Sequence, residues 1–83
     1  MRVNVFRRAE QDGNFSYLAV PEGKAIPAEV TNIDWEADSW GVDLNEGTDY
    51  MEEFAIAQPA QQIDAKGYAI TSSQNLGNAN RRL

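Results

Sequence analysis

A proline and a glycine bracket one short segment near the end of the chain, and this segment constrains the fold most strongly. The two residues are Pro59 and Gly67, and both belong to the stretch from Pro59 to Ser72, PAQQIDAKGYAITS. Proline suits the first position of a helix because its φ is fixed and it has no N–H, and glycine readily takes the left-handed conformation that ends a helix. The sequence therefore predicts a helix over about residues 58–66 that ends at Gly67.

This helix is expected to bury one narrow stripe and to lead into a strand. Small or apolar residues recur at three- and four-residue spacing: Ile56, Ala60, Ile63 and Gly67. After the glycine the period changes to two, with aromatic and β-branched residues in Tyr68 to Ser72. We therefore expect a strand there, joined to a sheet on which the helix packs.

Length and composition limit the function as well as the fold. Eighty-three residues form one small domain, which buries only about 60% of its unfolded surface, so a large enclosed active site is not expected. The chain has no cysteine and no histidine. Disulfides, thiolate and imidazole catalysis and the usual zinc sites are thereby excluded. We expect a protein that is not an enzyme and holds no cofactor or metal.

The first residues, MRVNVFRRAE, are charged and contain no continuous apolar run. This pattern is typical of neither a secretory signal nor a membrane anchor, so a cytoplasmic protein is expected.

Two strands are predicted at the start of the chain, over about residues 2 to 8 and 15 to 20. Asp12-Gly13 is a favoured pair for a two-residue turn, which would place Arg8 opposite Tyr17. The side expected to face the helix then holds Val3, Val5, Leu18 and Val20. The other side holds Phe6, Phe15, Tyr17 and Ala19. A slip of one residue in the turn would exchange these sets.

The middle of the chain is acidic. Between Glu29 and Glu53 there are nine carboxylates and no base: Glu29, Asp34, Glu36, Asp38, Asp43, Glu46, Asp49, Glu52 and Glu53. We expect an irregular connector whose large side chains cover the second face of the sheet and whose acids point outward. Alternation around residues 31 to 36 indicates a short extra strand as the competing interpretation.

Together these elements predict an α+β fold with the order ββαβ, a three-stranded, mainly antiparallel sheet and one helix on one face. A mostly-β curled sheet that includes residues 31–36 is the alternative. The compact domain is expected to span residues 1–72, and the polar residues 73–83 are expected to form a flexible tail.

Three segments carry a resemblance to a known family: VNVFRRAEQDGNFSYLAVPEGKAIP, TNIDWEA and QQIDAKGYAITS. They resemble a family of short, uncharacterised proteobacterial proteins that share a VxxYRRxE…SYLxVPEGxxIP start and a QIxxKGYAI end. The likeness covers about residues 1 to 72 and is weakest over residues 37 to 55. It implies one compact domain of unknown function and supplies no catalytic residue.

The candidate partner-binding residues are Trp35, Trp40, Asp38 and Asp43. We expect Trp35 mainly to cover the sheet, whereas Trp40, followed by Gly41 and set among acids, is expected to stay partly exposed. An aromatic ring surrounded by carboxylates suits a basic partner, through charge steering and cation–π contact. The leading hypothesis is therefore a small non-enzymatic protein-interaction or regulatory module.

Other classes remain as alternatives. The carboxylates of residues 34–43 alternate as in a calcium loop, although Ser39 and Asn45 stand where an EF-hand needs glycine and glutamate, so a metal-ion or small-molecule site is one alternative. An acidic mimic of nucleic acid is another. Direct nucleic-acid binding is disfavoured by the net charge of −6. The protein is expected to be a monomer or a weak homodimer that associates through a sheet edge, and the strand from Tyr68 to Ser72 could also capture an extended peptide if it lies at such an edge.

Overall fold

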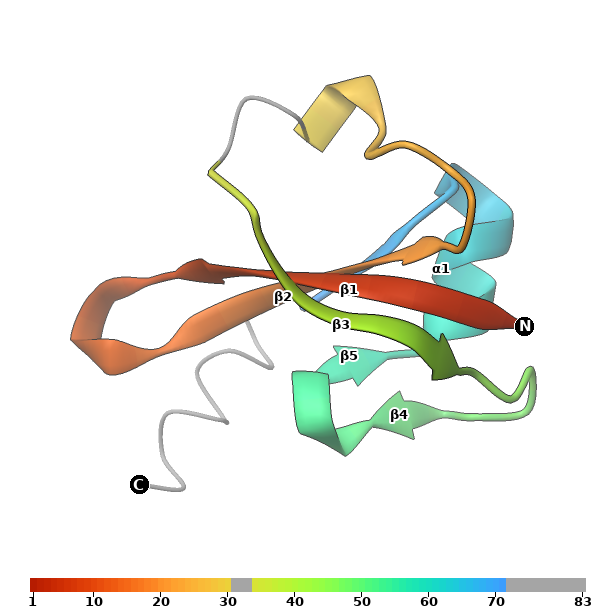
Figure 1. The fold of residues 1–83 in the computed structure, drawn as a ribbon. Helices are drawn as coiled ribbons and strands as arrows, with labels where there is room; N and C mark the ends of the chain where they lie inside the picture. The colour runs from red at the N-terminus through yellow and green to blue at the C-terminus, as the bar shows by residue number, and fades with distance from the viewer. Residues whose placement is uncertain (31–33, 72–83) are drawn as a thin grey trace.

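The computed structural model describes residues 1–30 and 34–71, which form one four-stranded antiparallel sheet, one small ribbon and one α-helix (Figure 1). The sheet has the order β3-β1-β2-β6, and the two-stranded ribbon consists of β4 and β5. In chain order the elements are β1 (Arg2–Ala9), β2 (Phe15–Pro21), β3 (Glu36–Asp43), β4 (Tyr50–Met51), β5 (Ile56–Ala57), α1 (Pro59–Lys66) and β6 (Ala69–Ile70). Three 3-10 turns lie at Gln11–Gly13, Ala28–Val30 and Glu52–Phe54. No helix in the described ranges has the length and apolar character needed to cross a bilayer.

The expected α+β class is confirmed, but the three-stranded ββαβ order is wrong. The additional sheet strand, β3, comes from the acidic segment that was expected to be an irregular connector. Residues 31–33, part of the alternative extra strand, lie outside the described residues, as does the predicted tail. Acidic residues and glycine disfavour strands, yet β3 pairs with the free edge of β1 and remains exposed along much of its length. Backbone pairing at an edge therefore overrode the low strand propensity.

The hairpin of β1 and β2 has a register one residue away from the expected one. Arg7 lies opposite Tyr17, and Val5 lies opposite Ala19. The prediction of a two-residue turn at Asp12-Gly13 is wrong. Residues 10–14 form a longer loop, which is closed by a hydrogen bond from the Glu10 N–H to the Asn14 carbonyl at 2.8 Å. This is the slip that exchanges side chains between faces.

As a result, the sheet has two separate apolar layers. One face packs against the ribbon and α1, and its buried cluster consists of Val3, Val5, Ala19, Leu44, Phe54, Ile56, Ile63 and Ala69. The opposite face carries a cluster of Leu18, Val20, Val30 and Tyr68. In Figure 1 the β4–β5 ribbon lies below the sheet and the turn Ala28–Val30 lies above it. Leu18 and Val20 therefore face away from Val3 and Val5, contrary to the expected grouping.

The helix forms where the proline and glycine predicted it. Pro59 is its first residue, and Gly67 follows it with φ of 90° and donates its N–H to the Ile63 carbonyl at 2.8 Å. Ile63 is buried in the cluster shared with Val3 and Val5. Gln58, just before the helix, has φ of 50° and makes no side-chain cap.

The outer edge of β6 is occupied by a side chain of the helix. The Gln62 amide oxygen accepts from the Ile70 N–H at 3.1 Å, and its NH₂ donates to the Ile70 carbonyl at 3.4 Å. The same NH₂ donates to the Ala57 carbonyl in β5 at 2.6 Å. Gln62 thus bonds to the outer edge of β6 as a neighbouring strand would.

We expect Gln58→Gly to stabilise the fold. A non-glycine residue in the left-handed region costs about 1–2 kcal/mol, which exceeds the roughly 0.5–1 kcal/mol that glycine loses in backbone entropy. The expected gain is about 0.5–1 kcal/mol in urea unfolding. The matched control is Gln61→Gly, within the helix, which should destabilise by about 1 kcal/mol. Equal effects of the two substitutions would contradict this account.

Gln62→Glu should test the role of the side-chain amide. The carboxylate keeps the shape but cannot donate to the Ala57 and Ile70 carbonyls, so we expect a loss of about 2 kcal/mol in the free energy of unfolding at neutral pH. Gln61→Glu makes the same charge change on the exposed side of the helix and should cost less than about 0.5 kcal/mol. A loss no larger than that of the control would show that the amide does not stabilise β6.

Candidate functional site

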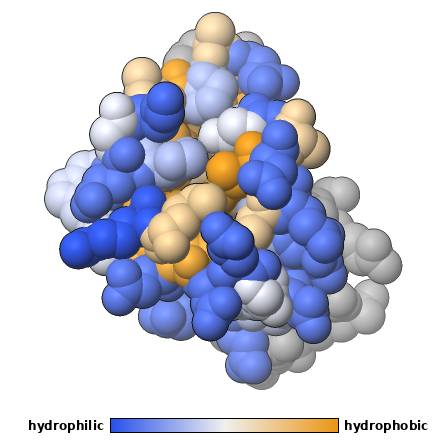
Figure 2. Space-filling model, turned by 90° about the vertical axis from the view of Figure 1, so that its right-hand side faces the viewer, coloured by the Kyte–Doolittle hydropathy of each residue, from blue (hydrophilic) through white to orange (hydrophobic). Residues whose placement is uncertain are grey.

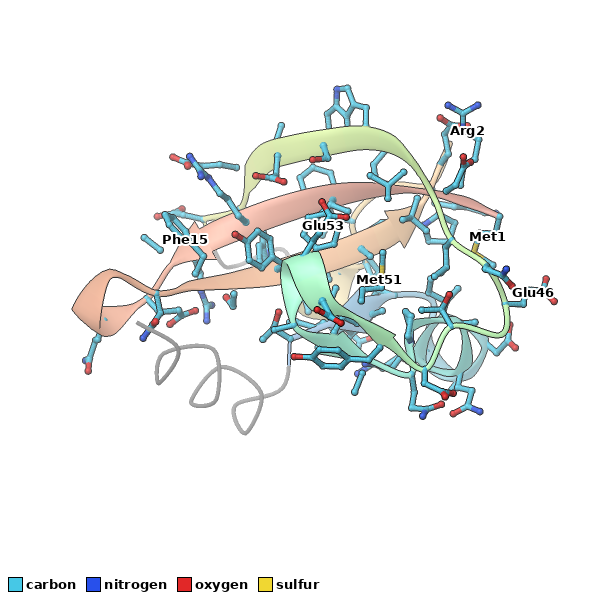
Figure 3. The ribbon with its side chains drawn as sticks, turned by 90° about the horizontal axis from the view of Figure 1, so that it is seen from below. Met1, Arg2, Phe15, Glu46, Met51 and Glu53 are labelled. Carbon is cyan, nitrogen blue, oxygen red and sulfur yellow. The ribbon has the colours of Figure 1, made fainter. Side chains whose placement is uncertain are left out.

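The candidate site lies on β3, an edge strand of the sheet. β3 pairs with β1 alone, so its other backbone edge carries no strand within the described residues. Figure 1 shows β3 crossing in front of β1, and in Figure 3 it forms the upper margin of the sheet, away from Met51 of the ribbon and Glu53 of the adjoining 3-10 turn. Within the described residues, β3 is therefore an edge strand with one unpaired side.

Two irregularities interrupt the pairing of β3 with β1. The register shifts once between the pairs Val3–Val42 and Val5–Ser39, and again before the pair Phe6–Ala37. At each shift β3 has one more residue than β1, as in a β-bulge. The first bulge contains Trp40 and Gly41, and the second contains Asp38.

Gly41 and Asn4 hold the bulge that contains Trp40. Gly41 has φ of 66° and donates its N–H to the Asn4 side-chain oxygen at 3.0 Å. A Cβ at Gly41 would stand 2.7 Å from Nη2 of Arg2, the far end of an exposed side chain that can move aside, so the positive φ is what disfavours other residues here. The bulge thus depends on glycine, and bulges of this kind redirect neighbouring side chains.

Trp40 is held on one side and open on the other. Its ring meets Phe6 of β1 edge to face, with 5.2 Å between ring centroids and 74° between planes. Even so, 60% of the residue is exposed. In the described residues, Met1 is the other large apolar residue of comparable exposure, at 46%. Figure 2 shows the side of the molecule that lies on the right in Figure 1, where the N-terminus is, and there hydrophilic side chains surround a small apolar strip.

The carboxylates of β3 differ in their partners. Glu36 lies 3.8 Å from Nε of Arg7. Arg2 stands opposite Asp43 in the register, but its guanidinium is 4.0 Å from Glu22. Asp38 accepts a hydrogen bond from the Ser39 hydroxyl at 2.9 Å. Within the described part of the chain, Asp38 and Asp43 are exposed and form no ion pair. We call Trp40, Asp38 and Asp43 the β3 surface.

Trp35 belongs to the packing of the sheet. It is half-buried against the cluster of Leu18, Val20, Val30 and Tyr68, and its indole N–H donates to the Val30 carbonyl at 2.9 Å. The Arg8 guanidinium lies 5.4 Å from its ring centroid. Trp35 thus covers the second face, as expected, whereas Trp40 is mostly exposed.

A shallow pocket of about 320 Å³ lies beside Trp35, lined by Arg8, Ala9, Asp34 and Glu36. The positively charged residue of the lining, Arg8, already forms an ion pair with Glu10. Glu10 also accepts from the Ser16 hydroxyl at 2.7 Å. The hydrogen bonds from Ser16 and Arg8 lower the pKa of Glu10. These contacts close the hairpin end of the sheet.

The calcium-like spacing does not form a coordination site. Residues 1–30 and 34–71 contain no group of three or more carboxylates placed to hold a metal ion. Glu36 and Asp38 lie along an extended strand, whereas a calcium loop must curl its ligands around one point.

Three supporting residues of the site were missed from the sequence: Phe6, Asn4 and Arg2. Their positions beside Trp40 and Gly41 depend on the pairing of β1 with β3, two segments separated by the whole hairpin. The one local signal was Gly41, because glycine within a strand often marks a bulge.

The lowered pKa of Glu10 gives a prediction for acid stability. A carboxyl whose pKa is lower in the folded state stabilises the fold above its ordinary pKa, and that contribution is lost as the pH falls through the folded value. We expect Ser16→Ala to raise the pKa of Glu10, measured by NMR titration, and to lower the unfolding midpoint more at pH 7 than in strong acid. An unchanged Glu10 pKa would contradict this prediction.

Comparison with protein-family models confirms the expectation of a family of unknown function. A model of the family of unknown function DUF6139 matches residues 1–77. No curated protein and no solved structure matches the chain. Because the match extends over nearly the whole sequence, the chain belongs to the family of unknown function DUF6139.

Proposed function

We propose that this protein is a small non-enzymatic interaction or regulatory module that binds a basic partner protein through the β3 surface. The observation that carries the proposal is Trp40, an indole 60% exposed on an edge strand, supported by Phe6. Large aromatic side chains are enriched among the residues that dominate binding energy. The absence of cysteine fits a partner in the cytoplasm.

Charge favours the same class of partner. The chain has a net charge of −6, and Asp38 and Asp43 flank Trp40 without an ion pair in the described residues. A surface of one sign attracts and orients a partner of the opposite sign. The exposed ring would supply contact area, and the carboxylates would supply selectivity for basic residues.

The two described groups whose pKa is shifted lie outside the β3 surface. Strongly shifted pKa values mark many catalytic sites. Here the pKa of Glu10 is lowered by Ser16 and Arg8, and the pKa of Tyr68 is raised by burial and by Glu29. Both shifts arise from contacts that close the fold, and neither group belongs to the β3 surface.

We expect Trp40→Ala to weaken partner capture about tenfold, because truncation of a central aromatic anchor typically costs more than 1 kcal/mol. The thermal melting temperature should change little, since 60% of the residue is exposed. The measurement is a pull-down from native lysate, followed by titration of the purified partner. Asp64→Ala, an exposed change on α1, is the control. Undiminished capture by the Trp40 variant would remove the β3 surface from the proposal.

A further inference from the structure

The aromatic rings of this protein differ in whether a cation lies over them. Arg7 lies 4.7 Å from the ring centroid of Phe15, Arg8 lies 5.4 Å from that of Trp35, and Lys66 lies 4.7 Å from that of Tyr68. Within residues 1–30 and 34–71, Trp40 has no such cation, although it is the more exposed tryptophan. Trp gives the strongest cation–π contacts of the aromatic side chains.

We infer that Trp40 receives an arginine side chain of the partner, stacked on its exposed face and paired with Asp38 or Asp43. This inference rests on the proposed function and names the group that the surface recognises. Arginine fits better than lysine because its planar guanidinium stacks on an aromatic ring and can also donate two parallel hydrogen bonds to a carboxylate.

Phe6 prepares the ring for this role. Its edge-to-face contact at 5.2 Å restrains the indole in the free protein, so less side-chain entropy is lost on binding. The Gly41 bulge, held by Asn4, sets the backbone from which the indole projects. The ring is therefore positioned before the partner arrives.

The structure favours side-chain capture over addition of a strand to β3. A regular added strand needs an even row of backbone donors and acceptors, but β3 is bulged at Asp38 and again at Trp40–Gly41. Bulges twist an edge and discourage pairing. A second copy of this chain is also disfavoured, because two acidic β3 strands with Glu36, Asp38 and Asp43 would repel each other.

The test uses the full chain and three short synthetic peptides of the same length: one arginine-rich, one with lysine in place of arginine, and one with neutral citrulline. Affinity is measured for every variant by NMR titration of the backbone amide signals, and in the chains that keep Trp40 its indole N–H signal is the local reporter. We expect that signal to shift most with the arginine peptide. Binding should be about three- to fivefold weaker with Trp40→Leu and less than about twofold weaker with Trp40→Phe.

Leucine keeps an apolar side chain but removes the π face, whereas phenylalanine keeps a π face, so this pair isolates the stacking contact. Asp38→Asn and Asp43→Asn report on the carboxylates. Asp64→Asn on α1 is the control for net charge and should leave the affinity within about 1.5-fold.

Three other results would contradict one or both proposals. If Trp40→Leu binds as tightly as the natural chain while the Asp38 and Asp43 variants bind more weakly, the β3 surface stands and the stacking inference fails. If none of these variants changes the affinity, both proposals fail. If replacing Arg81 and Arg82 by glutamine shifts the Trp40 indole signal in the absence of peptide, an arginine of the same chain contacts the ring. That result would overturn the inference.

Discussion

Pairing of β1 on both of its edges is the interaction on which the rest of the structure depends. On one side β1 pairs with β2, and this register decides which side chains face α1 and the ribbon and which face the turn at Ala28–Val30. On the other side it pairs with β3, which turns an acidic segment into part of the sheet. A change in either register would redistribute both the core and the exposed surface.

Polar side chains add hydrogen bonds that connect the short strands to neighbouring elements. The Thr71 hydroxyl donates to the Phe54 carbonyl at 2.7 Å and accepts from the Tyr17 N–H at 3.0 Å. Gln62 joins β5 to β6 in the same way. In so small a domain, a two-residue strand gains little from its own ladder, and these contacts connect it to the neighbouring layer.

The β3 surface arises because one strand both covers the edge of β1 and presents Trp40. β3 covers the edge of β1 and thereby protects the hairpin, but it becomes the exposed edge itself. Its two bulges and its carboxylates discourage further strand pairing, which is a common protection of sheet edges. The Trp40–Gly41 bulge also sets the backbone position of Trp40 above Phe6, so protection of the edge and presentation of an aromatic ring share one backbone feature.

The sequence by itself determined the local elements with strong signals. Pro59 and Gly67 mark the ends of α1, the period of two marks β1 and β2, and the absence of cysteine and histidine restricts the chemistry. Trp40 was also recognisable as an exposed candidate, because it stands between acids and is followed by glycine. These properties depend on residues near one another in the chain, where propensity and pattern are informative.

Only the tertiary structure decided the hairpin register, the existence of β3 and the surroundings of Trp40. The register depends on how residues 10–14 close, and Asp12-Gly13 alone does not specify that loop. β3 forms because its backbone pairs with the N–H and C=O groups on the edge of β1 that β2 leaves free, although acids and glycine disfavour a strand. Asn4 and Phe6 support Trp40 through contacts between distant parts of the chain, and no local pattern encodes such contacts.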